Sequence, residues 1–217
     1  MRPLTSYDLV IFDCDGVLVD TERLQVHIES RLLTELGWAL TPADVVRRWM
    51  GHTEAEMLAD IAEELGAEAA ERYRRRVSPE IEAAFARELT EVAGISDLLD
   101  GLDAAGVRTC VASSGSHERM AMTLGLTGLA DRFDGRIFSA VDVEHGKPAP
   151  DLFLHAAARM GVEPGRCAVI EDSASGVRAA VAAGMDVFGF AGGMAGPGPL
   201  VDGGAVLFER MADLLPG

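Results

Sequence analysis

Short apolar runs and amphipathic stretches alternate along most of this chain, and their order predicts its architecture. The first run, 9–12, is rich in β-branched and aromatic side chains and ends at Asp13, a pattern typical of a strand buried on both faces. Further strands are predicted at 107–112, 136–139, 167–170, 187–190 and 205–208. Helices are predicted between them at 116–125, 150–160 and 175–183, and the Gly- and Pro-rich stretch 191–204 is expected to be a surface loop. The alternation indicates an α/β fold, a Rossmann-like parallel sheet with helices on both faces.

The stretch 21–88 differs from the rest because it contains no strand pattern. Helices are expected there from Thr21 to Gly37 and at 42–49, 53–65 and 67–87. Thr53 and Glu56 have the spacing of a capping box, and Pro79 is expected to kink or restart the last of these helices. Since a lone strand would be unstable, the first strand must pair with the later ones. We therefore expect an α/β core domain, 1–19 with 89–217, interrupted by an all-helical cap domain, 20–88.

The chain is strongly acidic, with 35 acidic and 19 basic residues and a net charge of −16. Such a surface repels nucleic acid and anionic membranes, so we expect neither as a partner. Every apolar stretch falls short of the roughly 20 residues that cross a bilayer, and the N-terminal segment carries no signal-peptide pattern. The three cysteines lack metal-site spacing and lie in or beside strand-like segments, which indicates buried, reduced thiols. We expect a cytoplasmic monomer.

Polar side chains follow the first strand in a spacing that suits a charged site. Asp13 stands at the carboxyl end of the strand, where open α/β sheets keep their ligand crevice. The side chain of Asp15, two residues on, is expected to point to the same side as that of Asp13, with Cys14 turned away. Two carboxylates so close repel each other unless a cation lies between them or one is protonated. The simpler alternative is a turn, since Asp and Gly are turn residues.

Polar residues also follow three of the later strands. They are Ser113 to Ser116, then Gly146-Lys147-Pro148 after a loop, and Glu171-Asp172. Taken singly, each has a structural explanation, as a helix N-cap, a solvated loop lysine or an acidic pair at a helix start. A parallel sheet, however, places all its strand carboxyl ends at one edge. We therefore expect four carboxylates, a hydroxyl group with backbone amides and one lysine to line a single crevice.

This set of groups suits phosphoryl transfer. Carboxylates with open positions for water or phosphate are the ligands that Mg²⁺ prefers. An aspartate can act as the nucleophile through an aspartyl-phosphate, while a lysine and hydroxyl or amide donors stabilise the transferring group. We therefore expect Mg²⁺ as the cofactor and a small-molecule phosphoester as the substrate.

The same residues resemble a known family. Asp13-Cys14-Asp15-Gly16-Val17, Ser113, Lys147 with Pro148, and Glu171-Asp172 look like the four ordered motifs of the haloacid dehalogenase (HAD) superfamily. The resemblance spans essentially the whole chain. It is closest to the β-phosphoglucomutase-like sugar phosphatases, which carry a helical cap inserted after the first motif.

The resemblance implies a role for each motif residue. Asp13 would be the nucleophile, and Asp15 would be the general acid for the leaving group and then the general base for water. The groups that bind the substrate phosphate would be Ser113, Ser114 and Lys147. The Mg²⁺ ligands would be Asp13, Asp15 through its backbone carbonyl, Asp172, and Glu171 in or next to the metal shell. Asp20 would be only a helix cap.

The prediction is a magnesium-dependent phosphatase acting on a sugar, sugar-acid or polyol phosphate through an aspartyl-phosphate. Halide release is disfavoured, because the dehalogenases of the superfamily need no acid at the position of Asp15. A β-phosphoglucomutase-type mutase is the alternative, and it must hold the distal phosphate of a bisphosphate. Mutases carry cationic or histidine groups for this at positions that are Gln25, Glu54 and Ser116 here. Compensation by the cluster Arg74 to Arg76 is the remaining route to a mutase.

Two other classes fit the residues less well. A receiver-type signalling domain also combines acidic residues, a hydroxyl group and a lysine, but it has no place for the helical insertion. A catalytically idle binding protein on the same fold would not need the full set of chemical groups. Within the cap, the loop Gly51-His52-Thr53-Glu54 breaks two helices and matches the family's substrate-specificity loop, so it is expected to contact substrate. His52 is the candidate contact residue, with a purely structural role as its alternative. The cap is expected to be a mobile lid with hinges at 17–20 and 88–94.

Overall fold

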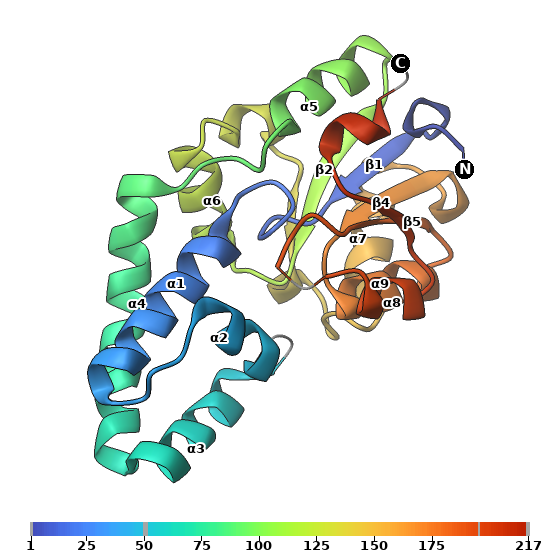
Figure 1. Ribbon diagram of the computed structural model, residues 1–217. Helices are drawn as coiled ribbons and strands as arrows, with labels where there is room; N and C mark the ends of the chain where they lie inside the picture. Colours follow the sequence, from blue (N-terminus) through green and yellow to red (C-terminus); the bar gives the residue numbers. More distant parts are fainter. Residues whose placement is uncertain (1, 50–51, 195, 216–217) are drawn as a thin grey trace. The chain divides into compact units, whose positions relative to one another are not determined.

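A computed structural model of the chain describes residues 2–49, 52–194 and 196–215 (Figure 1). The chain divides into two compact units. One is an α/β unit formed by Met1–Asp20 and Thr90–Gly217, and the other is a helical unit formed by Thr21–Leu89. Both boundaries fall one residue later than the expected cap limits of 20–88.

The α/β unit is built on a six-stranded parallel sheet in the order β3-β2-β1-β4-β5-β6. Its strands are β1 (Leu9–Phe12), β2 (Arg108–Ser113), β3 (Ile137–Ser139), β4 (Cys167–Glu171), β5 (Asp186–Phe190) and β6 (Val206–Phe208). Every residue of β1 is buried, which explains why its sequence is apolar throughout instead of alternating. The strand order reverses at β1, so the ligand crevice of such a sheet lies beside the carboxyl end of β1. The predicted Rossmann-like α/β fold is confirmed.

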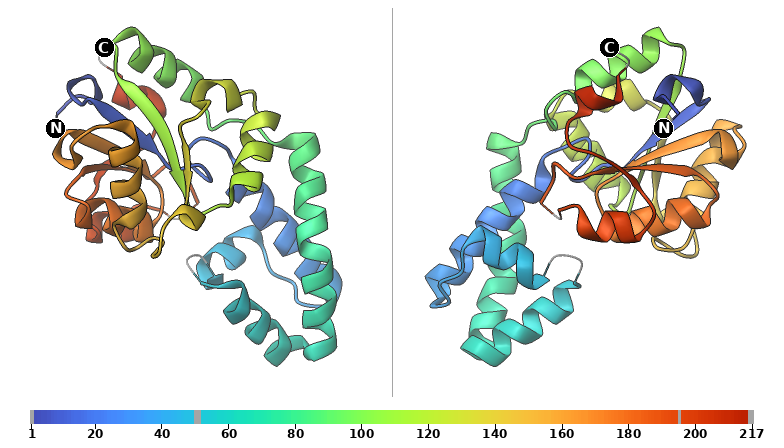
Figure 2. Two further views of the ribbon diagram at one scale, coloured as in Figure 1. Left: turned by 180° about the vertical axis from the view of Figure 1, so that it is seen from behind. Right: turned by 45° about the vertical axis from the view of Figure 1, so that its right-hand side comes forward.

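Helices cover both faces of the sheet (Figures 1 and 2). One face carries α7 (Asp151–Met160) and α8 (Ala174–Ala182), and the other carries α5 (Ile95–Ala104) and α6 (His117–Leu126). Ile11 packs in the core beneath α7 and α8, whereas its neighbour Phe12 meets the ring of Phe133 edge-on at 6.3 Å. This alternation follows from the two-residue period of a strand. It fixes which side chains of β1 are core and leaves its carboxyl end for the polar residues that follow.

Among the described residues of the α/β unit, the α-helices α5 and α9 (Gly198–Asp202) lie outside the predicted helices. The buried residues of α5, Ile95, Leu98, Leu99 and Leu102, do have helical spacing. The helix starts after Gly94, which adopts a left-handed conformation with φ 87°, so the usual Ser, Thr or Asp signal for a helix start is missing. The short helix α9 lies within the stretch expected to be a loop, where buried Leu200 anchors it to the core.

The two chain segments that lead out of the α/β unit and back into it are hydrogen-bonded to each other. The Asp20 amide donates to the Thr90 carbonyl at 3.0 Å, and the Val92 amide donates to the Leu18 carbonyl at 3.0 Å. Before this, the chain turns at Gly16, which has φ 77°, directly after Asp15. Both connections therefore leave from one short paired ribbon close to the end of β1.

The helical unit consists of α1 (Thr21–Leu36), α2 (Pro42–Trp49), α3 (Glu54–Leu65) and α4 (Ala67–Glu88). The predicted capping box is confirmed, since the Thr53 hydroxyl accepts the Glu56 amide and the Glu56 carboxylate accepts the Thr53 amide at 2.7 Å. Pro79 does not restart α4, which is one helix on both sides of it. The buried residues Tyr73, Val77 and Ile81 continue one apolar stripe past the proline, so packing outweighs the local preference of the ring.

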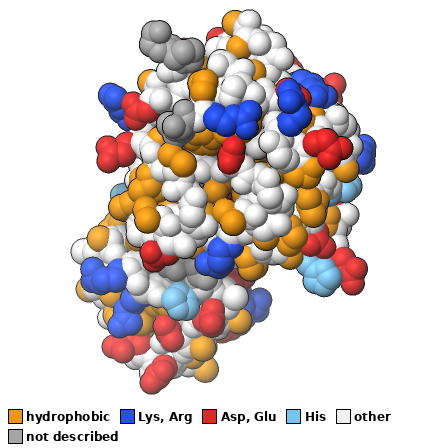
Figure 3. Space-filling model, turned by 90° about the vertical axis from the view of Figure 1, so that its right-hand side faces the viewer, with side chains coloured by type: hydrophobic (Ala, Val, Ile, Leu, Met, Phe, Trp, Pro, Cys, Tyr) orange, Lys and Arg blue, Asp and Glu red, His pale blue; other side chains and the backbone are white. Residues whose placement is uncertain are grey.

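The described surface carries acidic and basic side chains mixed together on the face that Figure 3 draws, although the chain carries a net charge of −16. All three cysteines, Cys14, Cys110 and Cys167, are buried and free, as expected. Within the described residues, no helix combines the length and the apolar character needed to cross a membrane.

The proline in α4 gives a first prediction. Pro79 is exposed and lacks the amide hydrogen that an interior helical residue donates to the carbonyl four positions earlier. Alanine restores this donor and removes the ring's clash, so Pro79→Ala should stabilise the helical unit by about 1–3 kcal/mol. Thermal unfolding followed by circular dichroism would show a higher Tm. Pro79→Gly, which restores the donor but not the helix propensity, should give a smaller rise, and a lower Tm in Pro79→Ala would contradict this account.

Candidate active site

The register of the sheet brings together polar residues that are far apart in the chain. Phe12 pairs with Val111 of β2 and Ile170 of β4, so Asp13 stands level with Glu171, the last residue of β4. Ser113 ends β2 at the same edge. Neighbouring strands lie about 4.8 Å apart, so side chains at this level of adjacent strands come within reach of each other.

Lys147 binds two carboxylates at this edge. Its Nζ donates to Asp13 Oδ1 at 2.6 Å and to Glu171 Oε1 at 2.6 Å, and its side chain is only 3% exposed. Burial by itself would lower the pKa of Lys147, but the charges of Asp13 and Glu171 outweigh it and raise the pKa above its ordinary value. Lys147 is therefore a fixed positive charge beside Asp13, and the alternative of a solvated loop lysine is wrong.

Asp13 is a buried carboxyl group whose protonation depends on nearby cations. Burial raises its pKa above the ordinary range; Lys147 opposes this effect and Glu171 adds to it. A dication bound beside Asp13 would act in the same direction as Lys147 and lower the pKa of Asp13, because a bound metal is often the largest charge in such a site. An ionised Asp13 is the form that can act as a nucleophile.

Three carboxylates here could hold a metal ion. Asp13, Glu171 and Asp172 are all buried, and each offers an oxygen that lies within 4.8 Å of those of the other two. The donors are all hard oxygen atoms, which is the chemistry of Mg²⁺. Glu171 is held by further contacts, because its Oε2 also accepts hydrogen bonds from the Ser173 amide at 2.8 Å and from the Ser173 hydroxyl at 2.9 Å.

The position of Glu171 depends on a glycine one turn into α8. A Cβ added at Gly176 would lie 1.7 Å from Glu171 Oε1, so no other residue leaves room for this carboxylate. The Gly176 amide donates to the Ser173 hydroxyl at 3.0 Å, which in turn donates to Glu171. The start of α8 therefore sets where Glu171 lies, and Glu171 sets where Lys147 lies.

The loop between β2 and α6 presents hydroxyl and amide groups at the same edge. Ser113 is buried, and its Oγ accepts the Gly115 amide at 3.2 Å. Ser139 at the end of β3 steadies the loop by donating to the Gly115 carbonyl at 2.6 Å, and Ser116 caps α6. Ser114 is exposed in the same loop. The amides that start a helix, together with serine hydroxyls, suit an anion such as phosphate.

Asp15 contacts a residue that the sequence analysis does not include. Arg119, in the first turn of α6, donates from Nη2 to Asp15 Oδ1 at 3.1 Å and from Nε to Asp15 Oδ2 at 3.4 Å. Arg119 lies three positions after the helix cap Ser116, where the helix dipole disfavours a positive charge. This unfavourable position is the sequence signal that could have identified Arg119 as a site residue. The same helix contacts Cys14, whose Sγ lies 3.9 Å from Thr123 Oγ1. Burial raises the pKa of the Cys14 thiol, so it is unreactive.

The candidate cap residues belong to the helical unit. His52 is exposed ahead of α3, and its amide donates to the Trp49 carbonyl at 2.9 Å; Gly51 lies outside the described residues. Gln25 donates to the buried Glu29 at 2.9 Å, and Glu54 is exposed in the first turn of α3. The substrate contact expected of His52 remains a prediction.

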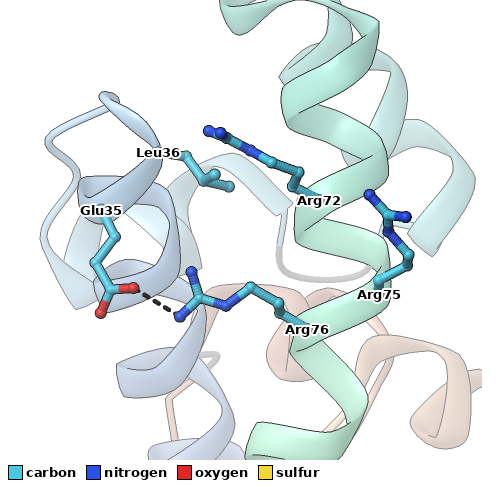
Figure 4. Close-up of a pocket in the computed structure, with 5 residues that line it drawn as sticks. All are labelled: Glu35, Leu36, Arg72, Arg75 and Arg76. Carbon is cyan, nitrogen blue, oxygen red and sulfur yellow. Dashed lines mark hydrogen bonds and ion pairs between the residues drawn. The ribbon is translucent and has the colours of Figure 1, made fainter.

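The arginine cluster of the helical unit is paired with glutamates. Arg76 donates to Glu35 at 2.7 Å and to Glu80 at 2.8 Å, as Figure 4 shows for the first of these contacts. Arg74 donates to Glu71 at 2.9 Å, and Arg75 lies 3.6 Å from the same carboxylate. Arg72, Arg75 and Arg76 line a pocket together with Glu35 and Leu36, at the carboxyl-terminal end of α1. Arg74, Arg75 and Arg76 are thus already paired with carboxylates of their own unit.

Known proteins resemble the chain over nearly its whole length. A family model described as haloacid dehalogenase-like hydrolase matches residues 10–190. The chain is 31% identical over 188 residues to 6-phosphogluconate phosphatase from Escherichia coli, covering 86% of this chain and 84% of the relative. It is 32% identical over 210 residues to phosphorylated carbohydrates phosphatase from Thermotoga maritima, covering 96% of each.

The fold is shared with a solved structure of the same family. A HAD family hydrolase from Deinococcus radiodurans, solved with bound phosphate and sodium, superimposes with a TM-score of 0.83 at 30% identity, over 97% of this chain and 94% of that one. The predicted family, its sugar-phosphatase branch and the predicted class of enzyme are confirmed by these relatives. The chain is a member of the haloacid dehalogenase-like hydrolases.

Proposed function

We propose that this protein is a magnesium-dependent phosphatase that hydrolyses a small phosphorylated sugar, sugar acid or polyol through an aspartyl-phosphate on Asp13. The observation that carries the proposal is the buried Asp13–Lys147–Glu171 contact, with Asp172 in the same cluster. Relatives named for 6-phosphogluconate and for phosphorylated carbohydrates support the substrate class. The phosphate and sodium named with the related hydrolase support a site for an anion beside a cation.

The metal fits the donor set at the end of β1. Asp13, Asp172 and the backbone carbonyl of Asp15 would hold Mg²⁺, which when bound neutralises the phosphate and favours ionised Asp13. Glu171 stands next to this shell, since both its oxygens already accept hydrogen bonds from Lys147 and Ser173. Its part is to place Lys147 and to add negative charge to the site.

The reaction then has two displacements at phosphorus. In the first, Asp13 attacks, the bond between phosphorus and the ester oxygen breaks, and Asp15 gives its proton to that oxygen. In the second, Asp15 takes a proton from water, the water oxygen attacks phosphorus, and the bond to Asp13 breaks, which releases inorganic phosphate. Lys147, the Ser113 hydroxyl and the loop at Ser114 stabilise the charge on the phosphoryl oxygens.

The helical unit would act as a mobile cap domain that selects the substrate. Both of its connections leave the α/β unit at the paired segments 18–20 and 90–92, a natural hinge. His52 is the proposed substrate contact in the cap. A mutase would need cationic groups in the cap to bind the distal phosphate of a bisphosphate. Here Gln25 already donates to Glu29, and Arg74 and Arg76 of α4 already pair with glutamates. This favours water over a second sugar hydroxyl as the acceptor.

The role of Asp13 is tested by removing its charge. Asp13→Asn should lower phosphate release by at least about a thousandfold, because the amide is a poor nucleophile and a poor metal ligand. The matched control is Asp8→Asn, which makes the same change at the other end of β1, where Asp8 pairs with Arg166 at the surface. Activity that survives in Asp13→Asn, or in wild-type protein treated with a chelator, would refute the proposal.

The choice between phosphatase and mutase is tested with one substrate. The protein is incubated with β-glucose 1-phosphate and a trace of the 1,6-bisphosphate, while free phosphate and glucose 6-phosphate are both followed. We expect hydrolysis to exceed isomerisation. Isomerisation faster than hydrolysis by tenfold, about 1.4 kcal/mol between the two barriers, would establish the mutase instead.

The dependence of the site on Gly176 is tested by adding one methyl group. Gly176→Ala should displace the Glu171 carboxylate, move Lys147 and cost about 1–3 kcal/mol of stability through overpacking, with kcat/KM falling by at least about tenfold. Gly125→Ala is the matched control, since a Cβ on that helical glycine meets open space. The control should be as active as wild type and slightly more stable. Equal behaviour of the two variants would show that the packing around Glu171 is not needed.

A further inference from the structure

The helix α6 touches the catalytic loop at two points one turn apart. Arg119 binds the carboxylate of Asp15, and Thr123 contacts the buried thiol of Cys14. Both loop residues directly follow Asp13 in the chain. The helix that begins at the phosphate-binding loop therefore also holds the segment that carries the acid–base group.

Asp15 lies beside the loop that would bind the phosphate. A Cβ added at Gly115 would be 3.7 Å from Asp15 Oδ2, 3.6 Å from Ser113 Oγ and 3.6 Å from Arg119 Cδ. These three side chains thus surround one small residue. The carboxylate of Asp15 therefore lies close to the Ser113 hydroxyl, one of the groups proposed to bind the phosphate.

Two features distinguish Arg119 from an ordinary surface cation. It approaches both oxygens of Asp15, from Nη2 at 3.1 Å and from Nε at 3.4 Å. Such a two-point contact fixes the plane of a carboxylate, which a single donor does not do. It also lies in the first turn of α6, where the helix dipole disfavours a positive charge. The contact with Asp15 gives a reason for a cation in that place.

We propose that Arg119 is a positioning residue for the acid–base step: it holds the Asp15 carboxylate in the orientation from which proton transfer to the leaving oxygen is fast. This rests on the proposed function, since it requires Asp15 to be the general acid. Proton transfer depends on alignment within hydrogen-bond reach, so loss of the fixed plane should slow it even when the carboxylate is present.

The test uses the leaving group as the reporter. A sugar phosphate that the wild-type protein hydrolyses has a poor leaving group and needs protonation, whereas p-nitrophenyl phosphate needs little. Arg119→Met should lower kcat for the sugar phosphate by at least about tenfold and change kcat for p-nitrophenyl phosphate and both KM values by less than about threefold. Arg119→Lys keeps the charge without the two-point contact and should restore less than half of the lost kcat.

A double-mutant comparison shows whether Arg119 acts through Asp15. In protein that already carries Asp15→Asn, Arg119→Met should cause no further loss on the sugar phosphate. Additive losses would overturn the proposal, as would equal losses on the two substrates or full rescue by Arg119→Lys. If Arg119→Met does not fold, the same comparison is made with Arg119→Gln, judged by circular dichroism.

Arg166→Met is the matched control. Arg166 also contacts both oxygens of an aspartate, Asp8, but at the amino-terminal end of β1. The ratio of the two kcat values should not change in this variant. A wild-type protein that releases no phosphate, or an active Asp13→Asn variant, would overturn the proposed function itself. Hydrolysis with normal dependence on Asp13 and Asp15, but with no selective effect of Arg119, would overturn only the positioning role.

Discussion

The ion pair of Lys147 with Asp13 and Glu171 is the interaction on which the rest of the site depends. In an acidic chain, buried carboxylates at neighbouring strand ends repel each other, and one buried ammonium group 2.6 Å from two of them offsets that repulsion. Glu171 is fixed in turn by Ser173 and by the space that Gly176 leaves. The start of α8 is therefore linked through Glu171 and Lys147 to the carboxyl group that would attack phosphorus. Motifs far apart in sequence form one network of charges.

A second set of contacts holds Asp15, the proposed acid–base group. The loop after β1 turns at Gly16 and is held by α6 through Arg119 and Thr123, independently of Lys147. In the proposed mechanism Asp13 is the nucleophile and Asp15 the acid–base group, so the two carboxylates would have to reach different atoms of the same phosphoester. Separate anchors from opposite faces of the sheet edge allow each carboxylate to keep its own orientation. The sheet determines where this edge lies, and contacts from the flanking elements determine how the side chains are oriented.

Much of this arrangement follows from the sequence because parallel strands obey simple rules. Apolar runs in the sequence locate the strands. Because parallel strands share one carboxyl edge, the sequence also predicts that Asp13, Ser113, Lys147 and Glu171 lie close together. Other features depend on contacts that no local pattern encodes. The meeting of Arg119 with Asp15 depends on how α6 is rotated about its axis, and the unbroken α4 at Pro79 depends on packing within the helical unit. The role of His52 stays a prediction, because its chemistry depends on a substrate.

The central claim is that Asp13 becomes covalently phosphorylated during turnover. It is tested most directly by mixing the protein with a hydrolysed sugar phosphate, quenching with acid within the first turnover, and mapping peptides by mass spectrometry. The account predicts one added phosphoryl group on the peptide that contains Asp13, which disappears when the quench is delayed until substrate is exhausted. Phosphate release in the same samples without any phosphorylated peptide, or with the phosphoryl group on another residue, would contradict it.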